Sequence, residues 1–258
     1  LTESSLQAKF QLSGPAAGYV NLRVSIPTAS ATATFTADSI VVATALSGQP
    51  YRLTTFSKVI NLAATGAGGM DTGIATASSW VAIYAIYNPT TSTSALLAVN
   101  AANTVMPVVY AGANMPSGYT ASALISVLRT TASSLLDIAF QTGNYITHQD
   151  RVVVNSGTVV ESLTNIAITG NVPGNAKSVN TKGNIASSSA NVTLSFATAA
   201  STTGIANTSA GSTNGVGGSG VSSQLPSIPI ITPQNISYSA SVGAGTMTFV
   251  LSTIGYYI

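Results

Sequence analysis

The chain has 258 residues, and its composition is unusual mainly in charge, since 5% of the residues are charged and 45% are hydrophobic. An ordinary soluble domain carries about 25% charged residues, so solubility must rest on Ser, Thr, Asn and Gly or on partners that cover the surface. The net charge is +2, and the eight basic residues are scattered without a stripe that could neutralise phosphates. We therefore expect no nucleic-acid partner.

Cysteine and membrane-targeting signals are both missing from the sequence. The absence of cysteine excludes disulfide bonds, zinc fingers and cysteine nucleophiles. No apolar run approaches the roughly 18 residues of a spanning helix, and the opening LTESSLQAKF does not have the pattern of a signal peptide. We expect no membrane insertion, and because the first residue is Leu1 we expect a fragment or a processed chain.

Residues 1–35 are predicted to form a connecting arm and a first strand. Gly and Pro interrupt the opening residues. Tyr19–Ile26 then alternates as a strand, with four apolar side chains expected on one face, namely Val20, Leu22, Val24 and Ile26. Pro27 ends this strand, and Thr28–Thr36 is predicted to be an edge strand or an extended linker.

Residues 36–154 are predicted to form the first lobe, and the strongest signal in it is Trp80–Tyr87. Both alternating faces of this run are apolar, which predicts a strand buried on both sides. Asn88 and Pro89 end it, because proline cannot donate to a ladder, and a hairpin return through Ala95–Val99 is expected. Two earlier strands are expected in this lobe, at Ile40–Leu46 and Tyr51–Leu62.

Another hairpin is predicted near the end of this lobe, from Ala123–Arg129 to Leu135–Gln141. In its second strand three side chains are expected to face the core, namely Leu136, Ile138 and Phe140. The side chains between them are expected to face solvent, namely Asp137, Ala139 and Gln141. Gly143-Asn144 then turns the chain into Tyr145–Val154.

Residues 155–258 are predicted to form a second β-rich lobe, since the composition shifts toward Ser, Asn, Gly and Thr beyond a boundary near Asn155. Residues 202–222 have low complexity and are expected to be a flexible, exposed loop. Ile236–Val242 and Met247–Leu251 alternate on either side of a Gly-rich turn, which predicts a hairpin. Two further strands are expected, at Val159–Thr169 and Val192–Thr198.

The spacing of the turn signals decides the fold class. Gly, Pro and Asn interrupt β-branched and aromatic runs about every eight to twelve residues, and no segment shows sustained helical periodicity. The sequence therefore predicts an all-β protein of antiparallel, jelly-roll-like β-sandwich lobes, with two lobes and little or no helix.

The triplet Asp71-Thr72-Gly73 matches the active-site triplet of aspartic proteases, in which two such carboxylates share one proton. No second DTG or DSG triplet occurs in the sequence. Asp and Gly are also standard turn residues, so we interpret the triplet as a turn before the strand that starts at Trp80.

No residue set stands out for hydrolase chemistry. The one histidine, His148, lies two residues from Asp150, too close along a strand for the geometry of a triad, and no G-x-S-x-G elbow occurs. We expect a surface or interface histidine. A glycosidase pair can be drawn on steric grounds from three acids, but nothing selects two of them: Asp137, Asp150 and Glu161. We therefore expect no enzyme activity and assign no catalytic residue.

Metal, cofactor and ligand sites are also unassigned. One histidine, no cysteine and six dispersed acids provide no dense ligand cluster, although a carbonyl-rich calcium site in a loop stays open. The tract Gly211–Gly220 lacks the Lys-Ser/Thr ending of a phosphate loop and is interpreted as a linker. Exposed loop tyrosines suit sugar stacking, although most tyrosines are expected to be ordinary sandwich residues; the positions considered are Tyr110, Tyr119, Tyr145, Tyr256 and Tyr257.

Three motifs between Asp38 and Val154 resemble a module of bacteriophage tail-fibre and related virion proteins. They are a DTG-like turn at Asp71–Gly73, a Trp-containing strand closing in Asn-Pro at Trp80–Pro89, and a P-S-G-Y turn at Pro116–Tyr119. These motifs are structural, so the resemblance carries over no catalytic, cofactor-binding or receptor-binding residue. It implies a β-sandwich in a virion, and tail fibres of this kind are generally trimers.

The resemblance implies a phage tail fibre or tail tip component, made in the host cytoplasm, that binds a bacterial surface glycan or outer-membrane receptor. A homotrimer is expected, because a strand apolar on both faces and scarce charge leave apolar surface for a symmetric interface. Other virion proteins are expected partners. Two alternatives remain: a capsid-decorating or baseplate-connecting protein with only virion partners, and a polysaccharide-degrading tailspike.

Overall fold

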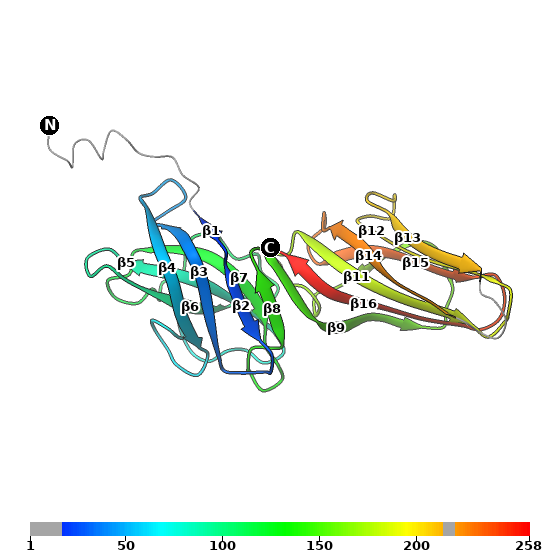
Figure 1. Cartoon of the computed structure of the whole chain (residues 1–258), viewed down its shortest axis with the longest axis horizontal. Coiled ribbons are helices and arrows are strands. Elements are labelled where there is room, and N and C mark those ends of the chain that lie inside the picture. The colour runs from blue at the N-terminus through cyan, green and yellow to red at the C-terminus, as the bar shows by residue number, and fades with distance from the viewer. Residues whose placement is uncertain (1–16, 214–219) are drawn as a thin grey trace.

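The computed structural model describes residues 17–213 and 220–258, and within these ranges the chain forms strands and no helix (Figure 1). All pairings between these strands are antiparallel, so the predicted all-β, antiparallel sandwich class is confirmed. The described residues contain no helix able to cross a bilayer. The strands are β1 (Gly18–Val20), β2 (Arg23–Ile26), β3 (Thr32–Ala43), β4 (Pro50–Asn61), β5 (Trp80–Asn88), β6 (Thr93–Asn100), β7 (Ala121–Arg129), β8 (Ala139–Thr142), β9 (Tyr145–Ser156), β10 (Val160–Ala167), β11 (Ser178–Ser187), β12 (Thr193–Ala199), β13 (Thr208–Thr213), β14 (Val221–Pro229), β15 (Asn235–Val242) and β16 (Met247–Tyr257).

The strands form a twelve-stranded sheet and a four-stranded sheet. The larger sheet has the order β14-β11-β16-β9-β8-β2-β3-β7-β5-β6, with β1 and β4 also paired to β3, and the smaller has the order β10-β15-β12-β13. Figure 1 shows two lobes, with β1–β8 in the first and β9–β16 in the second. β9 connects them, because its first residues pair with β8 while the strand also pairs with β16.

β5 lies at the centre of the first lobe. Trp80–Ile86 is buried without interruption, because β6 and β7 pair with its two edges and both of its faces are covered. The Oδ1 atom of Asn88 accepts hydrogen bonds from the N–H groups of Thr90 and Thr91, which ends the strand in a tight turn. The predicted doubly buried strand and its hairpin return are confirmed.

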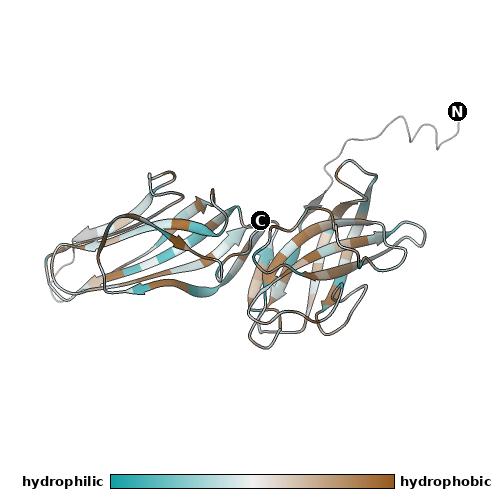
Figure 2. Ribbon diagram, turned by 180° about the vertical axis from the view of Figure 1, so that it is seen from behind, coloured by the Kyte–Doolittle hydropathy of each residue, from teal (hydrophilic) through white to brown (hydrophobic). Residues whose placement is uncertain are grey.

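The second lobe is a sandwich whose core lies between the two sheets. The ring centroids of Phe196 on β12 and Phe249 on β16 are 5.7 Å apart, and Tyr238 stacks on Phe249 at 6.0 Å. Gly183 on β11 makes room for this packing, because a Cβ atom at that position would collide with the Phe196 ring. Figure 2 shows apolar segments alternating with polar ones along the strands, as strands with one buried face require.

The first predicted strand is interrupted. Asn21 has a φ of 54°, so β1 ends before it and β2 begins only at Arg23. Backbone in this left-handed region breaks the alternation of side chains. Val20 is consequently 49% exposed, whereas Leu22 and the alternate residues of β2 are buried as predicted.

The prediction of an edge strand or linker at Thr28–Thr36 is wrong for its second half. Thr32 begins the twelve-residue strand β3, which pairs with β4 on one side and with β1, β2 and β7 on the other. Threonine and alanine are compatible with an interior strand when neighbours complete both ladders.

Two predicted hairpins are wrong in their partners. β7 pairs with β5 and β3, and only the isolated bridge Thr130↔Leu136 closes the turn that follows it. β15 belongs to the four-stranded sheet and β16 to the twelve-stranded sheet, so the turn at 243–246 crosses between sheets. Alternation predicted these strands correctly, but it carries no information about which strand lies alongside.

The orientation of β8 is the reverse of the prediction. Phe140 is 47% exposed, whereas Ala139 and Gln141 are buried. The alternation does not continue from Leu136, because β8 begins only at Ala139. Gln141 is tolerated inside because its Nε2 atom donates hydrogen bonds to the carbonyl oxygens of Ile125 and Gly143, at 2.9 and 2.8 Å.

The predicted loop at residues 202–222 is partly strand. β13 pairs with β12 from Thr208 to Thr213, and β14 begins at Val221, so hydrogen bonding to neighbouring strands orders residues of low complexity. Residues 214–219, which include most of the glycine tract, lie outside the described residues. The predicted lobe boundary near Asn155 falls at the end of β9.

Candidate functional site

The outer face of the first lobe presents an exposed array of polar side chains. Every second residue of β2 and β8, and of β3 as far as Asp38, is exposed, and the residues between them fill the core. The exposed set combines hydroxyl groups with one cation, one carboxylate and one aromatic ring: Arg23, Ser25, Thr32, Thr34, Thr36, Asp38, Phe140 and Thr142. Such a face can contact a ligand without any rearrangement of the fold.

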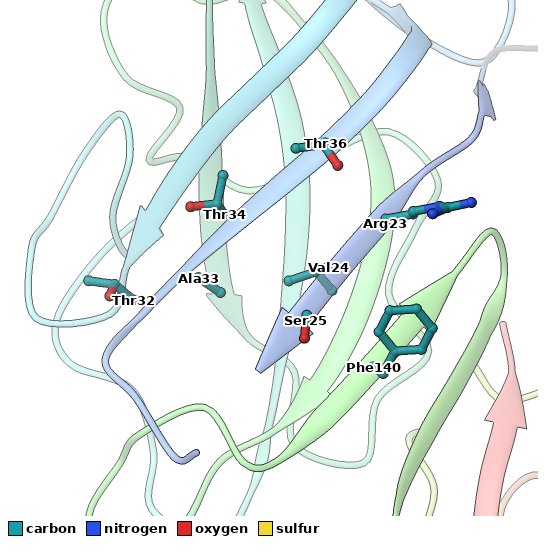
Figure 3. Close-up of a pocket in the computed structure, with 8 residues that line it drawn as sticks. All are labelled: Arg23, Val24, Ser25, Thr32, Ala33, Thr34, Thr36 and Phe140. Atoms are coloured by element: carbon teal, nitrogen blue, oxygen red, sulfur yellow. The ribbon is translucent and has the colours of Figure 1, made fainter. Parts of the chain in front are cut away.

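A hollow of about 500 Å³ opens on this face between β2 and β3 (Figure 3). The ladder between the two strands contains only the pairs Arg23↔Thr36 and Val24↔Phe35. Beyond them β2 and β3 are not paired, and Ser30, in the segment that connects the two strands, forms a bridge with Leu136. The hollow therefore forms where the ladder ends.

Arg23 on β2 and Phe140 on the neighbouring strand β8 lie at one side of the hollow, and the threonines of β3 lie at the other side (Figure 3). The register of β2 and β8 places Phe140 opposite Ser25 and Thr142 opposite Arg23, so Arg23 and Phe140 are diagonal neighbours. Within the described part of the chain, the guanidinium of Arg23 is in none of the ion pairs. A cation without an ion-pair contact and an exposed ring therefore flank a group of hydroxyls.

The hollow has a neighbour on each side. One, of about 730 Å³, shares Arg23 and Thr36 with it and extends to β4. The other, of about 310 Å³, shares Ser25 and Phe140 with it and extends to β9. The three hollows cross β4, β3, β2, β8 and β9, and since paired strands lie about 4.8 Å apart the row is about 19 Å wide. We call this row the outer-face row.

A second cluster joins the two lobes. The indole Nε1–H of Trp80 donates to the carbonyl oxygen of Thr169 at 3.1 Å, and the hydroxyl of Tyr256 donates to the carbonyl oxygen of Val127 at 2.6 Å. The rings of Trp80 and Tyr256 meet edge to face with centroids 5.8 Å apart, and the Arg151 guanidinium lies 5.7 Å from the Trp80 centroid. These contacts fix the lobes to each other.

Arg151 is the charged residue at the centre of this junction. Its Nη2 atom lies 3.0 Å from the carboxylate of Asp137, which also faces Arg129 at 3.5 Å. Arg151 donates to the carbonyl oxygen of Asn171 at 3.3 Å, and Asn171 returns a 2.9 Å hydrogen bond to the Arg151 carbonyl oxygen. Burial lowers the pKa of Arg151, whereas Tyr256 and Asp137 oppose that change. We assign the cluster to structure, because its partners are already paired.

His148 lies inside the protein, with 7% of its surface exposed, and not at the predicted surface position. Its Nδ1 atom is 2.7 Å from the carbonyl oxygen of Gln149, so the neutral ring donates from Nδ1, and Nε2 has no partner among the described residues. Burial lowers the pKa of His148 to about 4, and the positive charge of Arg151 acts in the same direction. Asp150 pairs instead with Lys182 at 3.0 Å, so no triad is assembled around His148.

The DTG triplet forms a bend in which Gly73 has a φ of 63°. One oxygen of Asp71 accepts from the N–H of Thr72 at 2.8 Å, and the other accepts from the hydroxyl of Tyr110 at 2.9 Å. Tyr110 also packs edge to face on Tyr84, with centroids 5.6 Å apart. The carboxylate therefore anchors a loop to the core.

The acids considered for glycosidase chemistry lie in different settings. Asp137 pairs with Arg151 and Asp150 pairs with Lys182, whereas Glu161 is exposed on β10 of the other sheet. Across residues 17–213 and 220–258, no three His, Asp or Glu side chains gather closely enough to hold a metal ion.

The tyrosines considered for sugar stacking are all at least half buried. Tyr110 and Tyr256 are buried, Tyr119 is half buried, and Tyr145 and Tyr257 stack on each other with centroids 4.6 Å apart. The exposed aromatic ring on the outer face is that of a residue predicted to lie in the core, Phe140.

The turn between β8 and β9 contains a signal that could have identified the exposed ring. A two-residue turn at Gly143-Asn144 places Gln141 opposite Ile146 and Phe140 opposite Thr147. Ile146 alternates with polar residues and must face the core. Since directly opposite residues share a face, Phe140 belongs with Thr147 on the polar side.

A groove of about 820 Å³ lies at the junction of the two lobes, beside β1. Its lining is mainly apolar, and two lining side chains are strongly exposed, Val105 at 58% and Val108 at 44%. Other apolar lining residues are Tyr19, Met106, Leu124, Ile230 and Ile258.

Comparison with known proteins identifies no family for the chain. No family model and no curated protein matches it. Two solved Bacillus thuringiensis proteins align at 9% identity: a Cry1Da tryptic core variant, covering 97% of this chain and 54% of that one with a TM-score of 0.24, and the insecticidal delta-endotoxin Cry8Ea1, covering 98% and 55% with a TM-score of 0.20. The chain spans about half the length of both, and TM-scores this low support no inference about function.

Proposed function

We propose that the chain is a non-catalytic structural component of a bacteriophage virion, in a tail fibre or tail tip, that attaches the particle to a bacterial surface glycan or outer-membrane receptor. The observation that carries this proposal is the outer-face row, where the exposed side chains of Arg23 and Phe140 lie beside a group of hydroxyls. The motifs at Asp71–Gly73, Trp80–Pro89 and Pro116–Tyr119, which resemble those of virion proteins, support placing this binding face on a particle.

The shape of the outer-face row suits repeated weak contacts. Exposed ion pairs contribute only about 0–1 kcal/mol each unless an arginine contacts a carboxylate through two hydrogen bonds, so one shallow row with a single such arginine binds weakly. Several copies on one particle raise the effective concentration and convert weak contacts into durable attachment. A homotrimer is the assembly we propose, and the exposed apolar side chains that it would cover include Ile74 at 78% and Leu46 at 73%.

The absence of catalysis is part of the proposal. Asp137 and Asp150 are each in an ion pair, with Arg151 and Lys182, and among the described residues the buried ring of His148 bonds to a backbone carbonyl and to no carboxylate. A polysaccharide-degrading tailspike needs two carboxylates on either side of the scissile bond. Release of reducing ends from a host glycan would favour the tailspike.

The second candidate function is a capsid-decorating or baseplate-connecting role with only virion partners. The apolar groove at the lobe junction favours it, because Val105 and Val108 expose apolar surface of the kind that protein partners cover. Both candidates place the chain on the particle surface after synthesis in the host cytoplasm.

A binding experiment separates the two candidates. Purified protein is incubated with host cells, with isolated lipopolysaccharide and with the other virion proteins, and the bound fraction is measured. Saturable binding to cells supports attachment. Tight binding to a virion protein without binding to cells would overturn it in favour of the second candidate.

A further inference from the structure

We infer that the outer-face row binds an oligosaccharide that carries carboxylate groups, with Arg23 contacting a carboxylate and Phe140 packing against a sugar ring. The inference rests on the proposed attachment function and specifies the chemical class of its receptor.

The charged side chain that lines the central hollow favours an anionic ligand. Arg23 is the only charged residue that lines it, and within the described residues its guanidinium is in no ion pair. Asp38, on the same face, keeps its negative charge but lines the neighbouring hollow and not the central one, and its carboxylate accepts a 2.6 Å hydrogen bond from the side-chain amide of Asn21. A guanidinium presents paired N–H donors that match the two oxygens of a carboxylate.

The other residues that line the hollow favour a sugar as the molecule that carries the negative charge. A pyranose has an apolar C–H face and a polar rim of hydroxyls. The Phe140 ring, 47% exposed, offers a surface for the apolar face. Ser25, Thr34 and Thr36 offer hydroxyls that both donate and accept hydrogen bonds, as sugar hydroxyls do.

The width of the outer-face row favours a chain of several sugars over a single sugar. Arg23 lies between the central hollow and the hollow toward β4, and Phe140 lies between the central hollow and the one toward β9. A single sugar would occupy one hollow. Successive sugars can occupy the neighbouring hollows along the width of about 19 Å given by the strand spacing.

A peptide fits this face less well. The hollow toward β9 has apolar walls from Ile26, Pro27 and Ile138, but a peptide strand would also need a free sheet edge for main-chain hydrogen bonds. β2 and β8 are interior strands, each with a neighbour on both sides. The central hollow, which lies over these interior strands, therefore lacks the free edge that a peptide strand would pair with.

The test measures binding of the full chain to oligogalacturonate, oligomannuronate and oligosialate, each beside its carboxyl-reduced form, by calorimetric titration. We expect at least one of them to bind at least about tenfold more tightly than its reduced form, since hydrogen bonds to charged groups are the stronger ones. Arg23→Gln should lower that affinity about tenfold and remove the preference for the carboxylated form. Phe140→Ser should lower the affinity for both the carboxylated and the carboxyl-reduced form. Arg52→Gln removes a charge on β4 outside the row and serves as the matched control. It should leave the affinity for both forms unchanged.

The same variants are tested for retention on host cells, so that the two proposals can fail separately. Retention of the wild type on cells, with no binding of any carboxylated probe or with unchanged binding in Arg23→Gln, would overturn the inference and leave the attachment function standing. Lack of retention on cells would count against the attachment function itself. Equal binding of the reduced and carboxylated probes would show a neutral-sugar site and would also overturn the inference.

Discussion

Acidification tests the buried position of His148. Burial lowers the pKa of this ring from 6.5 to about 4, so between these pH values the unfolded chain binds a proton that the folded chain does not. The free energy of unfolding therefore falls as the pH decreases from about 6.5 to about 4 and changes no further through this group below that range. At 1.36 kcal/mol for each pKa unit, the full loss is about 3 kcal/mol.

The physical reason lies in the two ring nitrogens. The neutral ring already donates from Nδ1 to the carbonyl oxygen of Gln149, at 2.7 Å. Protonation would place a second N–H group at Nε2, which is buried and has no partner among the described residues, and would bring a positive charge toward Arg151. His148→Asn removes the titrating ring and keeps a donor at a similar position to Nδ1.

The assay is denaturant-induced unfolding between pH 7 and pH 4.5, with the free energy of unfolding compared between wild type and variant. The difference between the two should shrink as the pH falls, because only the wild type loses the contribution of His148. Thr147→Ser, a matched change at the neighbouring exposed position of β9, should follow the wild type. Parallel pH curves for wild type and His148→Asn would refute the reasoning.

Three further predictions concern the lobe junction and the second core. Tyr256→Phe should lower the free energy of unfolding by about 1–3 kcal/mol, because the buried Val127 carbonyl loses its 2.6 Å hydrogen bond; no change in denaturant midpoint would contradict this role. Gly183→Val should cost about 1–3 kcal/mol, because the Phe196 ring must move, and an unaltered melting temperature would show that the ring has room. Arg151→Lys should lower the melting temperature at both low and high salt, because the partly buried pair and the contact with the indole ring depend on the planar guanidinium; a loss that disappears at high salt would indicate a simple surface charge effect.

The sequence predicted the strands well where local pattern alone decides. β5 is the clearest case, because apolar residues on both faces have only one stable environment, a strand covered on both sides. The turn after Asn88 was also predictable, since asparagine and proline impose it through their own side chains.

Strand partners were not predictable in the same way. β15 and β16 alternate on either side of a short Gly-rich turn, yet they belong to different sheets. Whether such a turn makes a hairpin or crosses between sheets depends on where distant strands leave an open edge. β11 and β9 occupy the two edges of β16, and nothing local to the turn encodes that.

The candidate site was missed for a related reason. Arg23 and Phe140 come together only because β2 pairs with β8, a contact between distant parts of the chain. The prediction also placed Phe140 in the core, because an exposed phenylalanine is uncommon and the alternation was extended from Leu136. The interruption before Ala139 shifts the register by one residue, which is enough to exchange the two faces of a strand.

The retention of purified protein on washed host cells tests the central claim most directly, measured before and after the surface polysaccharide is removed. The account predicts saturable retention that is lost with the polysaccharide and is reduced about tenfold by Arg23→Gln but not by Arg52→Gln. Absence of retention by the wild type, with tight binding to another virion protein, would contradict the claim of attachment.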